Sequence, residues 1–278
     1  MPEGDTLHRT AARLGPALVG REVTRWRAFR PDLRFPDRTG RRVLAVEARG
    51  KNLLVRFDDR RVLWTHLGMG GVWQLVRPGE RWRRPPHLAR AVIANEVACA
   101  VCFAAPDIEL LTEPEVERHR VLSRLGPDLL AAEPDLDEAL RRLRADPARP
   151  LGEAVLDQRA VAGIGNVYKS EMLFLARLDP FAPVGGLDPA RLGTLLRATR
   201  RMLQRNLGPH RRRTREGRGP RHWVYERAGL GCLRCHERIG MQRQGATGRS
   251  TYFCRRCQGV GDSHRRPDAR ATPLRDSR

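Results

Sequence analysis

The chain has 278 residues, with 53 Lys and Arg against 32 Asp and Glu, which gives a formal net charge of +21. This length is enough for a sizeable core and about two domains. A charge this high indicates a polyanionic partner, nucleic acid first and an anionic membrane surface second. No apolar run approaches the ~18 residues of a membrane span, and residues 1–20 lack the apolar core of a signal peptide. We therefore expect a cytoplasmic, nucleoid-associated protein with no membrane partner.

The first residues, Met1-Pro2-Glu3, contain a candidate nucleophile. Removal of Met1 would leave Pro2 with a free secondary amine, and an α-amino group has a pKa of ~8 against ~10.4 for lysine. Such an amine attacks aldehyde-like carbons and forms an iminium, while the adjacent Glu3 is placed to move protons. Because an exposed, frayed terminus is the commoner structure for such a start, this interpretation depends on the rest of the chain.

The first half predicts one helix followed by many strands. Residues 5–19 have a helical apolar stripe, with Asp5 or Thr6 as the cap and Gly20 at the end. From residue 23 to 103, short apolar runs separated by turn residues predict a β-sandwich or barrel. The longest apolar run, residues 97–106, is expected to be a buried strand, with Cys99 and Cys102 as core thiols.

The second half predicts helices over residues 135–144, 151–158, 166–176 and 189–206, with no β-α-β alternation. The expected fold class is therefore α+β with two domains. We place a β-sandwich domain with flanking helices at residues 1–118, a helical domain at 119–222, a finger at 223–262 and a disordered tail at 263–278. The basic run at 209–221 is expected to be a mobile linker that attracts phosphates diffusely.

Four of the six cysteines form the strongest local motif. Cys232-x2-Cys235 and Cys254-x2-Cys257 are separated by 18 residues. Four thiolates fill a closed tetrahedral zinc site without an open position for catalysis, so we expect one structural Zn²⁺ per chain. Arg249 lies in the turn-rich segment between the pairs and is suited to contact a phosphate or a groove; a merely solvated arginine is the alternative.

A second motif, Gly163-Ile164-Gly165-Asn166, opens a predicted helix. Glycines before a helix let backbone amides approach an anion, and the helix N-terminus adds partial positive charge, so a phosphate is the expected ligand. A packing turn is the usual alternative for such glycines. Lys169, three residues further on, is expected to be a solvated helix residue.

These motifs occur in one characteristic order: N-terminal Pro-Glu, Gly50-Lys51 in a β-rich half, Gly-Ile-Gly-Asn-x-Tyr in a helical half, and a four-cysteine finger with Arg249 before its third cysteine. In this order the chain resembles the formamidopyrimidine-DNA glycosylase/endonuclease VIII family of base-excision repair enzymes over residues 2–260. The resemblance implies a helix–two-turn–helix motif, a zinc-finger β-hairpin, and a bifunctional glycosylase/AP lyase that acts on damaged double-stranded DNA. It implies a monomer without a small-molecule cofactor.

The resemblance also implies roles for individual residues. Pro2 would attack C1′ of the damaged nucleotide, Glu3 would transfer protons, and β,δ-elimination would leave a one-nucleotide gap. Lys51 and Arg249 would join these two in catalysis. Lys51, Asn166 and Arg249 would also contact DNA phosphates, and Met69 would fill the space left by the flipped base. That Met69 simply packs in its loop is the alternative.

The lesion class is less constrained than the chemistry. The opening Pro-Glu-Gly and residues 106–111 resemble the endonuclease VIII branch, and the Arg-Arg-Phe element typical of the formamidopyrimidine branch is absent, which favours oxidised pyrimidines. Residues 66–71, His-Leu-Gly-Met-Gly-Gly, resemble the formamidopyrimidine branch instead, and Thr6 stands where the family often has Glu. Two alternatives stay open: a formamidopyrimidine/8-oxoguanine glycosylase, and a catalytically silent zinc-finger protein that binds damage.

Overall fold

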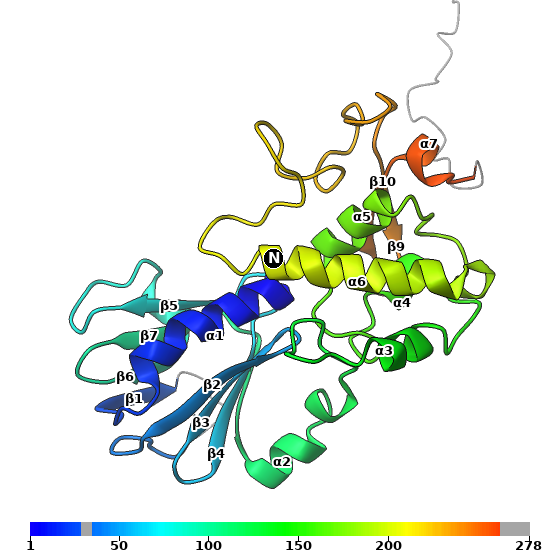
Figure 1. The fold of residues 1–278 in the computed structure, drawn as a ribbon. Helices are drawn as coiled ribbons and strands as arrows, with labels where there is room; N and C mark the ends of the chain where they lie inside the picture. The colour runs from blue at the N-terminus through cyan, green and yellow to red at the C-terminus, as the bar shows by residue number, and fades with distance from the viewer. Residues whose placement is uncertain (29–34, 262–278) are drawn as a thin grey trace, which may run out of the picture.

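The computed structural model describes residues 1–28 and 35–261 (Figure 1). Its N-terminal half holds two antiparallel four-stranded sheets. Across the first sheet, the strands are in the order β1 (Arg25–Ala28), β6 (Ala89–Ala94), β7 (Cys99–Phe103) and β5 (Val72–Val76). Across the second sheet, the order is β2 (Val43–Arg49), β3 (Asn52–Phe57), β4 (Arg61–His66) and β8 (Asp107–Thr112). The predicted α+β class and N-terminal β-sandwich are confirmed. The tail predicted to be disordered lies outside the described residues.

The sandwich core forms where the two sheets and helix α1 (Gly4–Leu18) meet. Leu7 and Leu14, two turns apart on one face of α1, are fully buried with strand residues of both sheets. Cys99 and Cys102 lie on the predicted buried strand and are buried, which confirms them as core thiols.

The predicted cap of α1 is wrong. Its N-cap is Glu3, without a side-chain cap hydrogen bond. Asp5 and Thr6 lie inside the first turn of the helix, where the Asp5 carboxylate pairs with Arg212 from the distant basic run. The helix also begins and ends one residue earlier than predicted.

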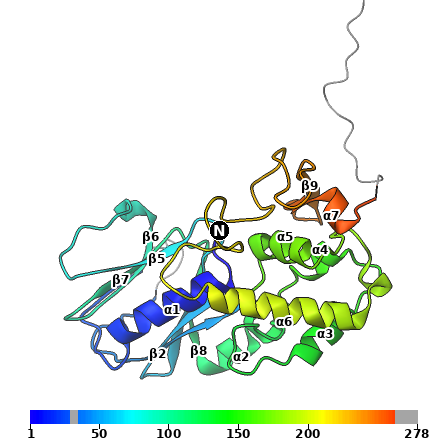
Figure 2. The same ribbon diagram turned by 45° about the horizontal axis from the view of Figure 1, so that its top comes forward.

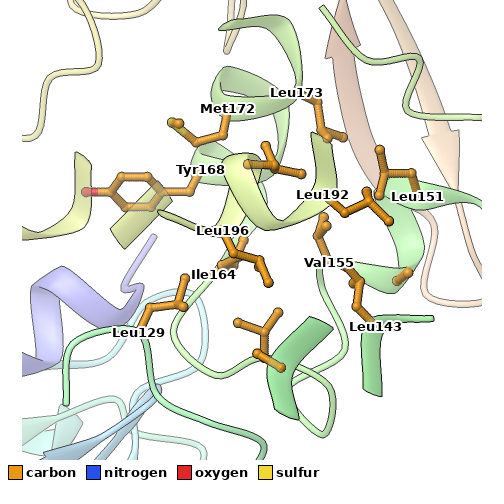
Figure 3. Packing of buried hydrophobic residues seen from close by; sticks show 14 of the residues in the cluster. Leu129, Leu143, Leu151, Val155, Ile164, Tyr168, Met172, Leu173, Leu192 and Leu196 are labelled. Carbon is orange, nitrogen blue, oxygen red and sulfur yellow. The ribbon is translucent and has the colours of Figure 1, made fainter. Parts of the chain in front are cut away.

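The helical half contains α2 (Glu113–Arg118), α3 (Leu136–Leu143), α4 (Leu151–Ala154), α5 (Asn166–Leu175) and α6 (Pro189–Arg205), with 3-10 turns at Leu122–Arg124 and Val184–Gly186. A further 3-10 turn, Pro86–Leu88, lies between β5 and β6 in the N-terminal half. Figure 3 shows side chains of α3, α4, α5 and α6 packed into one core. The helix predicted at 151–158 begins correctly but ends at Ala154. Asp157 accepts the backbone amide of Arg159 at 3.0 Å, a local bond that competes with helix continuation.

A two-stranded hairpin, β9 (Gly240–Gln244) and β10 (Arg249–Phe253), follows, with α7 (Arg255–Gln258) after it. The cysteines Cys232 and Cys254 pack in a small core with Phe174 of α5, which holds the finger against the helical half. No helix among the described residues is long and apolar enough to cross a membrane.

The basic run is an ordered strap, contrary to the prediction of a mobile linker. The Asn206 side chain bonds the backbone of Arg213 at both its amide and its carbonyl, at 2.8 and 2.9 Å. The Thr214 hydroxyl donates to the buried carboxylate of Glu171. That carboxylate also accepts three backbone amides, those of residues 223–225. Figure 2 shows this segment beside the N-terminus.

Candidate active site

The N-terminus lies between the sandwich and the helical half, at a pocket of about 320 Å³. The lining residues include five of the predicted site residues: Pro2, Lys51, Met69, Asn166 and Arg249. They come from five separate segments, namely the N-terminus, the β2–β3 turn, the β4–β5 loop, the start of α5 and β10. The structure therefore brings together at one pocket residues that the sequence analysis placed in separate segments of the chain.

Glu3 is fully buried beside this pocket. Its carboxylate accepts the backbone amides of Gly165, Val167 and Tyr168 at 3.1, 2.8 and 3.3 Å. These are the free amides at the N-terminus of α5, so the anion bound there is Glu3 and the predicted phosphate at these amides is wrong. A Cβ at Gly165 would lie 2.3 Å from the carboxyl carbon of Glu3, so glycine is required for this contact.

Lys51 is held by the tight turn between β2 and β3. Gly50 has a φ of +58°, and a Cβ there would lie 3.1 Å from the Cβ of Ala162. The Gly50 amide donates to Asp128 at 2.6 Å, and Asp128 also bonds His8 of α1 at 3.1 Å. One carboxylate thus ties the lysine turn to α1 and to the helical half.

The electrostatics of the pocket make Lys51 easier to deprotonate than an exposed lysine. Burial lowers the pKa of Lys51 to about 8; nearby Glu3 opposes this shift, while Arg249 and Arg212 reinforce it. A cationic pocket of this kind attracts phosphate and disfavours protonation of a neighbouring amine.

Met69 and Arg249 face each other at the mouth of the pocket. Met69 is 71% exposed, so it does not pack within its loop, and its sulfur lies 3.8 Å from the Arg249 guanidinium. The buried Oδ1 atom of Asn166 has no hydrogen-bond partner among residues 1–28 and 35–261. These three side chains are therefore available to a ligand that enters the pocket.

Lys169 is buried, and the prediction of a solvated helix residue is wrong. Its ammonium donates to the Ser250 carbonyl at 3.1 Å and to the Thr251 hydroxyl at 2.7 Å. The side chain therefore connects α5 to β10, directly beside Arg249. Burial, together with the nearby charge of Arg249, lowers the pKa of Lys169 to about 7.

We expect this lysine to make stability depend on pH. Its pKa is about 7 in the fold and ~10.4 when unfolded. The unfolded chain thus binds more protons between these values, and the free energy of unfolding should rise with pH there. Denaturant unfolding at pH 7 and pH 9 should show the advantage of wild type over Lys169→Met growing with pH. Lys169→Arg, which does not titrate, is the control. An advantage that is constant with pH would contradict the prediction.

The four predicted cysteine ligands form one cluster, with all sulfur atoms within 4.8 Å of one another. Two of the sulfur pairs are 3.8 and 3.4 Å apart. A tetrahedron with Zn–S bonds of about 2.3 Å places its sulfurs about 3.8 Å apart. The residues fit a metal ion of this kind.

Known proteins are similar to this chain in sequence and in fold. Residues 1–106 match the formamidopyrimidine-DNA glycosylase N-terminal domain, and residues 125–215 match the formamidopyrimidine-DNA glycosylase H2TH domain. A probable endonuclease 8 2 of Streptomyces coelicolor is 43% identical over 93% of this chain and 94% of its own. The DNA-(apurinic or apyrimidinic site) lyase Nei2 of Mycolicibacterium smegmatis is 38% identical over 93% of this chain and 99% of its own.

Among solved structures, the MutM (Fpg) protein of Thermus thermophilus matches with a TM-score of 0.75 and 31% identity, over 94% of this chain and all of that one. Together, the fold and the matches define a DNA-repair glycosylase. The chain belongs to the formamidopyrimidine-DNA glycosylase/endonuclease 8 family, which confirms the resemblance seen in the sequence.

Three residues of the site were missed by the sequence analysis. Arg212 lies 3.7 Å from the Glu3 carboxylate and pairs with Asp5, and Asp128 holds the turn of Gly50 next to Lys51, all through contacts that span a large part of the chain. Neither Asp128 nor Arg212 lies in a recognisable motif, and Arg212 is one of several arginines in the basic run at 209–221. Only the three-dimensional structure distinguishes them.

Proposed function

We propose that this chain is a bifunctional DNA glycosylase/AP lyase of base-excision repair. The observation that carries the proposal is the pocket in which Pro2 meets Lys51, Asn166 and Arg249, with Glu3 buried beside it. A damaged base inside a duplex cannot reach such a pocket, so the nucleotide would be flipped out of the stack. The relatives named endonuclease 8 and apurinic/apyrimidinic lyase support this assignment.

The reaction uses the amine that removal of Met1 exposes. The nitrogen of Pro2 bonds to C1′ as the bond to the base breaks, and Glu3 supplies a proton for opening the sugar. The resulting iminium withdraws electrons, so the 2′ hydrogen is lost as a proton and the 3′ phosphate leaves. A second elimination releases the 5′ phosphate and leaves a one-nucleotide gap.

The remaining pocket residues would position the DNA. Lys51, Asn166 and Arg249 would contact phosphates around the damaged nucleotide, and Lys51 and Arg249 would also support the chemistry. Met69 would enter the space that the flipped base leaves, because its exposed thioether stands at the mouth of the pocket.

We propose oxidised pyrimidines as the substrates. The opening Pro-Glu-Gly motif favours the endonuclease 8 branch, and the relatives of 43% and 38% identity bear names of that branch. A formamidopyrimidine/8-oxoguanine specificity is the alternative that the His66–Gly71 motif supports. Excision assays on defined lesions separate the two.

We further propose one structural Zn²⁺ at the four cysteines, which closed thiolate coordination favours. The protein would act on damaged double-stranded DNA as a monomer in the cytoplasm, without a small-molecule cofactor. The domain boundaries at residues 118/119 and 222/223 stay predictions.

The test is trapping of the iminium with borohydride. Protein with a native N-terminus should cross-link to an abasic duplex and to a 5-hydroxyuracil duplex, and Pro2→Gly should be strongly impaired. An extra residue before Pro2 removes the amine without changing Pro2, so this form should also fail to cross-link. Absence of trapping by wild type that lacks Met1 but still binds DNA would leave the silent damage-binding protein as the function.

A further inference from the structure

Arg212 reaches from the basic strap to the first turn of α1. Its Nε donates to the Asp5 carboxylate at 2.9 Å, and its Nη2 donates to the same carboxylate and to the Thr6 hydroxyl at 2.8 Å. Asp5 is fully buried, so this two-pronged ion pair is shielded from water. The strap is therefore fastened to the segment that begins the chain.

The same guanidinium lies beside the proposed nucleophile. Its Nη1 is 3.7 Å from the Glu3 carboxylate and 3.3 Å from the Met1 carbonyl oxygen. The Met1 carbonyl carbon is bonded to the nitrogen of Pro2, the atom that becomes the amine once Met1 is removed. The Tyr168 ring lies 5.2 Å from the guanidinium carbon and helps to fix its orientation.

We infer that Arg212 is a positioning residue for the lyase reaction, one that balances the two buried carboxylates next to the Pro2 amine and so keeps that amine in its free-base form. The inference rests on the proposed function, because it assigns a role in forming the iminium. Glu3 and Asp5 alone would stabilise the protonated amine, whereas a fixed cation beside it favours the neutral form.

The charge of Arg212 is present throughout the working pH range. Burial alone would lower its pKa, but Glu3 and Asp5 outweigh burial and raise the pKa above its ordinary value. The charged and titratable groups that face this region from the packed elements are Glu3, Asp5, Arg9, Lys51, His66, Tyr168, His222, Tyr225 and Arg249. Arg212 contacts both carboxylates in this set.

The ion pair between Arg212 and Asp5 also explains why threonine fits at position 6, where the family often has Glu. The Thr6 hydroxyl accepts from Arg212 without adding charge. A glutamate there would place a third carboxylate beside Glu3 and Asp5, whose guanidinium partners among the described residues are Arg212 and, for Asp5, also Arg9 at 3.6 Å. Threonine at this position therefore fits a site in which Asp5 already supplies the anionic partner.

The test is the rate of borohydride trapping on an abasic duplex, measured with saturating enzyme from pH 6 to pH 9. In Arg212→Gln we expect the acidic limb of the pH–rate profile to move up by about one pH unit, which is a ~10-fold loss of rate at pH 7 that shrinks to about twofold at pH 9 for an amine with a pKa of ~8. Arg212→Lys should restore most of the wild-type pH profile, because lysine keeps the positive charge. The restoration should be incomplete because lysine cannot form the two-pronged contact with the carboxylate. Arg211→Gln, an exposed neighbour with the same charge loss, should keep the wild-type profile.

A loss of equal size at every pH would show that Arg212 only supports the fold, and an unchanged profile would show no role; either result overturns the inference. If Arg212→Gln does not fold, the double variant Asp5→Asn/Arg212→Gln removes the orphaned carboxylate as well. The acidic limb of the pH–rate profile of this double variant should then return towards that of wild type. An acidic limb that stays fully shifted would count against the inference. Absence of trapping by wild type itself would overturn the proposed function and this inference with it.

Discussion

Replacement of Glu3 by Gln should reduce base excision by about 10²–10⁴-fold, the usual contribution of a positioned proton donor. The carboxylate accepts three backbone amides at the start of α5, so its location is rigidly fixed. A glutamine cannot satisfy all three amides, because its NH₂ group is a donor. We therefore also expect a loss of about 1–3 kcal/mol in the free energy of unfolding.

Single-turnover excision from a 5-hydroxyuracil duplex measures the first effect and denaturant unfolding the second. Trapping on a preformed abasic duplex should fall less than excision, because the aldehyde form already exists there and less proton transfer is needed. The exposed Glu117→Gln on α2 is the matched control and should change none of these quantities. Excision by Glu3→Gln within tenfold of wild type would exclude Glu3 as the proton donor.

Local patterns in the sequence were enough to predict much of the architecture. Short apolar runs with turn residues between them predicted the sandwich, and the cysteine spacing predicted the cluster found in the structure. Pro2, Lys51, Asn166 and Arg249 could be selected because each lies in a short motif and the motifs occur in the order that the family resemblance requires. Signals of this kind depend only on neighbouring residues, so they can be recognised without the fold.

The errors have one physical cause: partners that are distant in sequence. Lys169 has the pattern of a solvated helix residue, yet the hairpin β9–β10 covers it and supplies its acceptors. Arg212 lies in a polar, proline-containing run typical of a linker, but Asp5 and Glu3 bind it from the other end of the chain. The amides of α5 suit a phosphate, but the protein itself provides the anion.

Replacement of Cys254 by Ser should prevent binding of the proposed Zn²⁺ and abolish tight binding to damaged DNA. The four sulfurs belong to a small core with Phe174, so we expect the hairpin that bears Arg249 to lose its structure when the cluster is broken. Loss of one charged hydrogen bond costs about 1.5–3 kcal/mol, so affinity for an abasic duplex should fall by about 10–100-fold from Arg249 alone. Metal analysis and a binding titration at fixed salt measure the two effects.

Cys102→Ala is the matched control, because Cys102 is a buried thiol of the sandwich that lies outside the cluster. This variant should keep one zinc per chain and wild-type DNA affinity, even if its sandwich is less stable. The β-sandwich should stay folded in Cys254→Ser, because the core of the sandwich contains no residue of the finger. Full DNA affinity in a metal-free Cys254→Ser protein would show that the hairpin positions Arg249 without the metal, and the structural role of zinc would then be wrong.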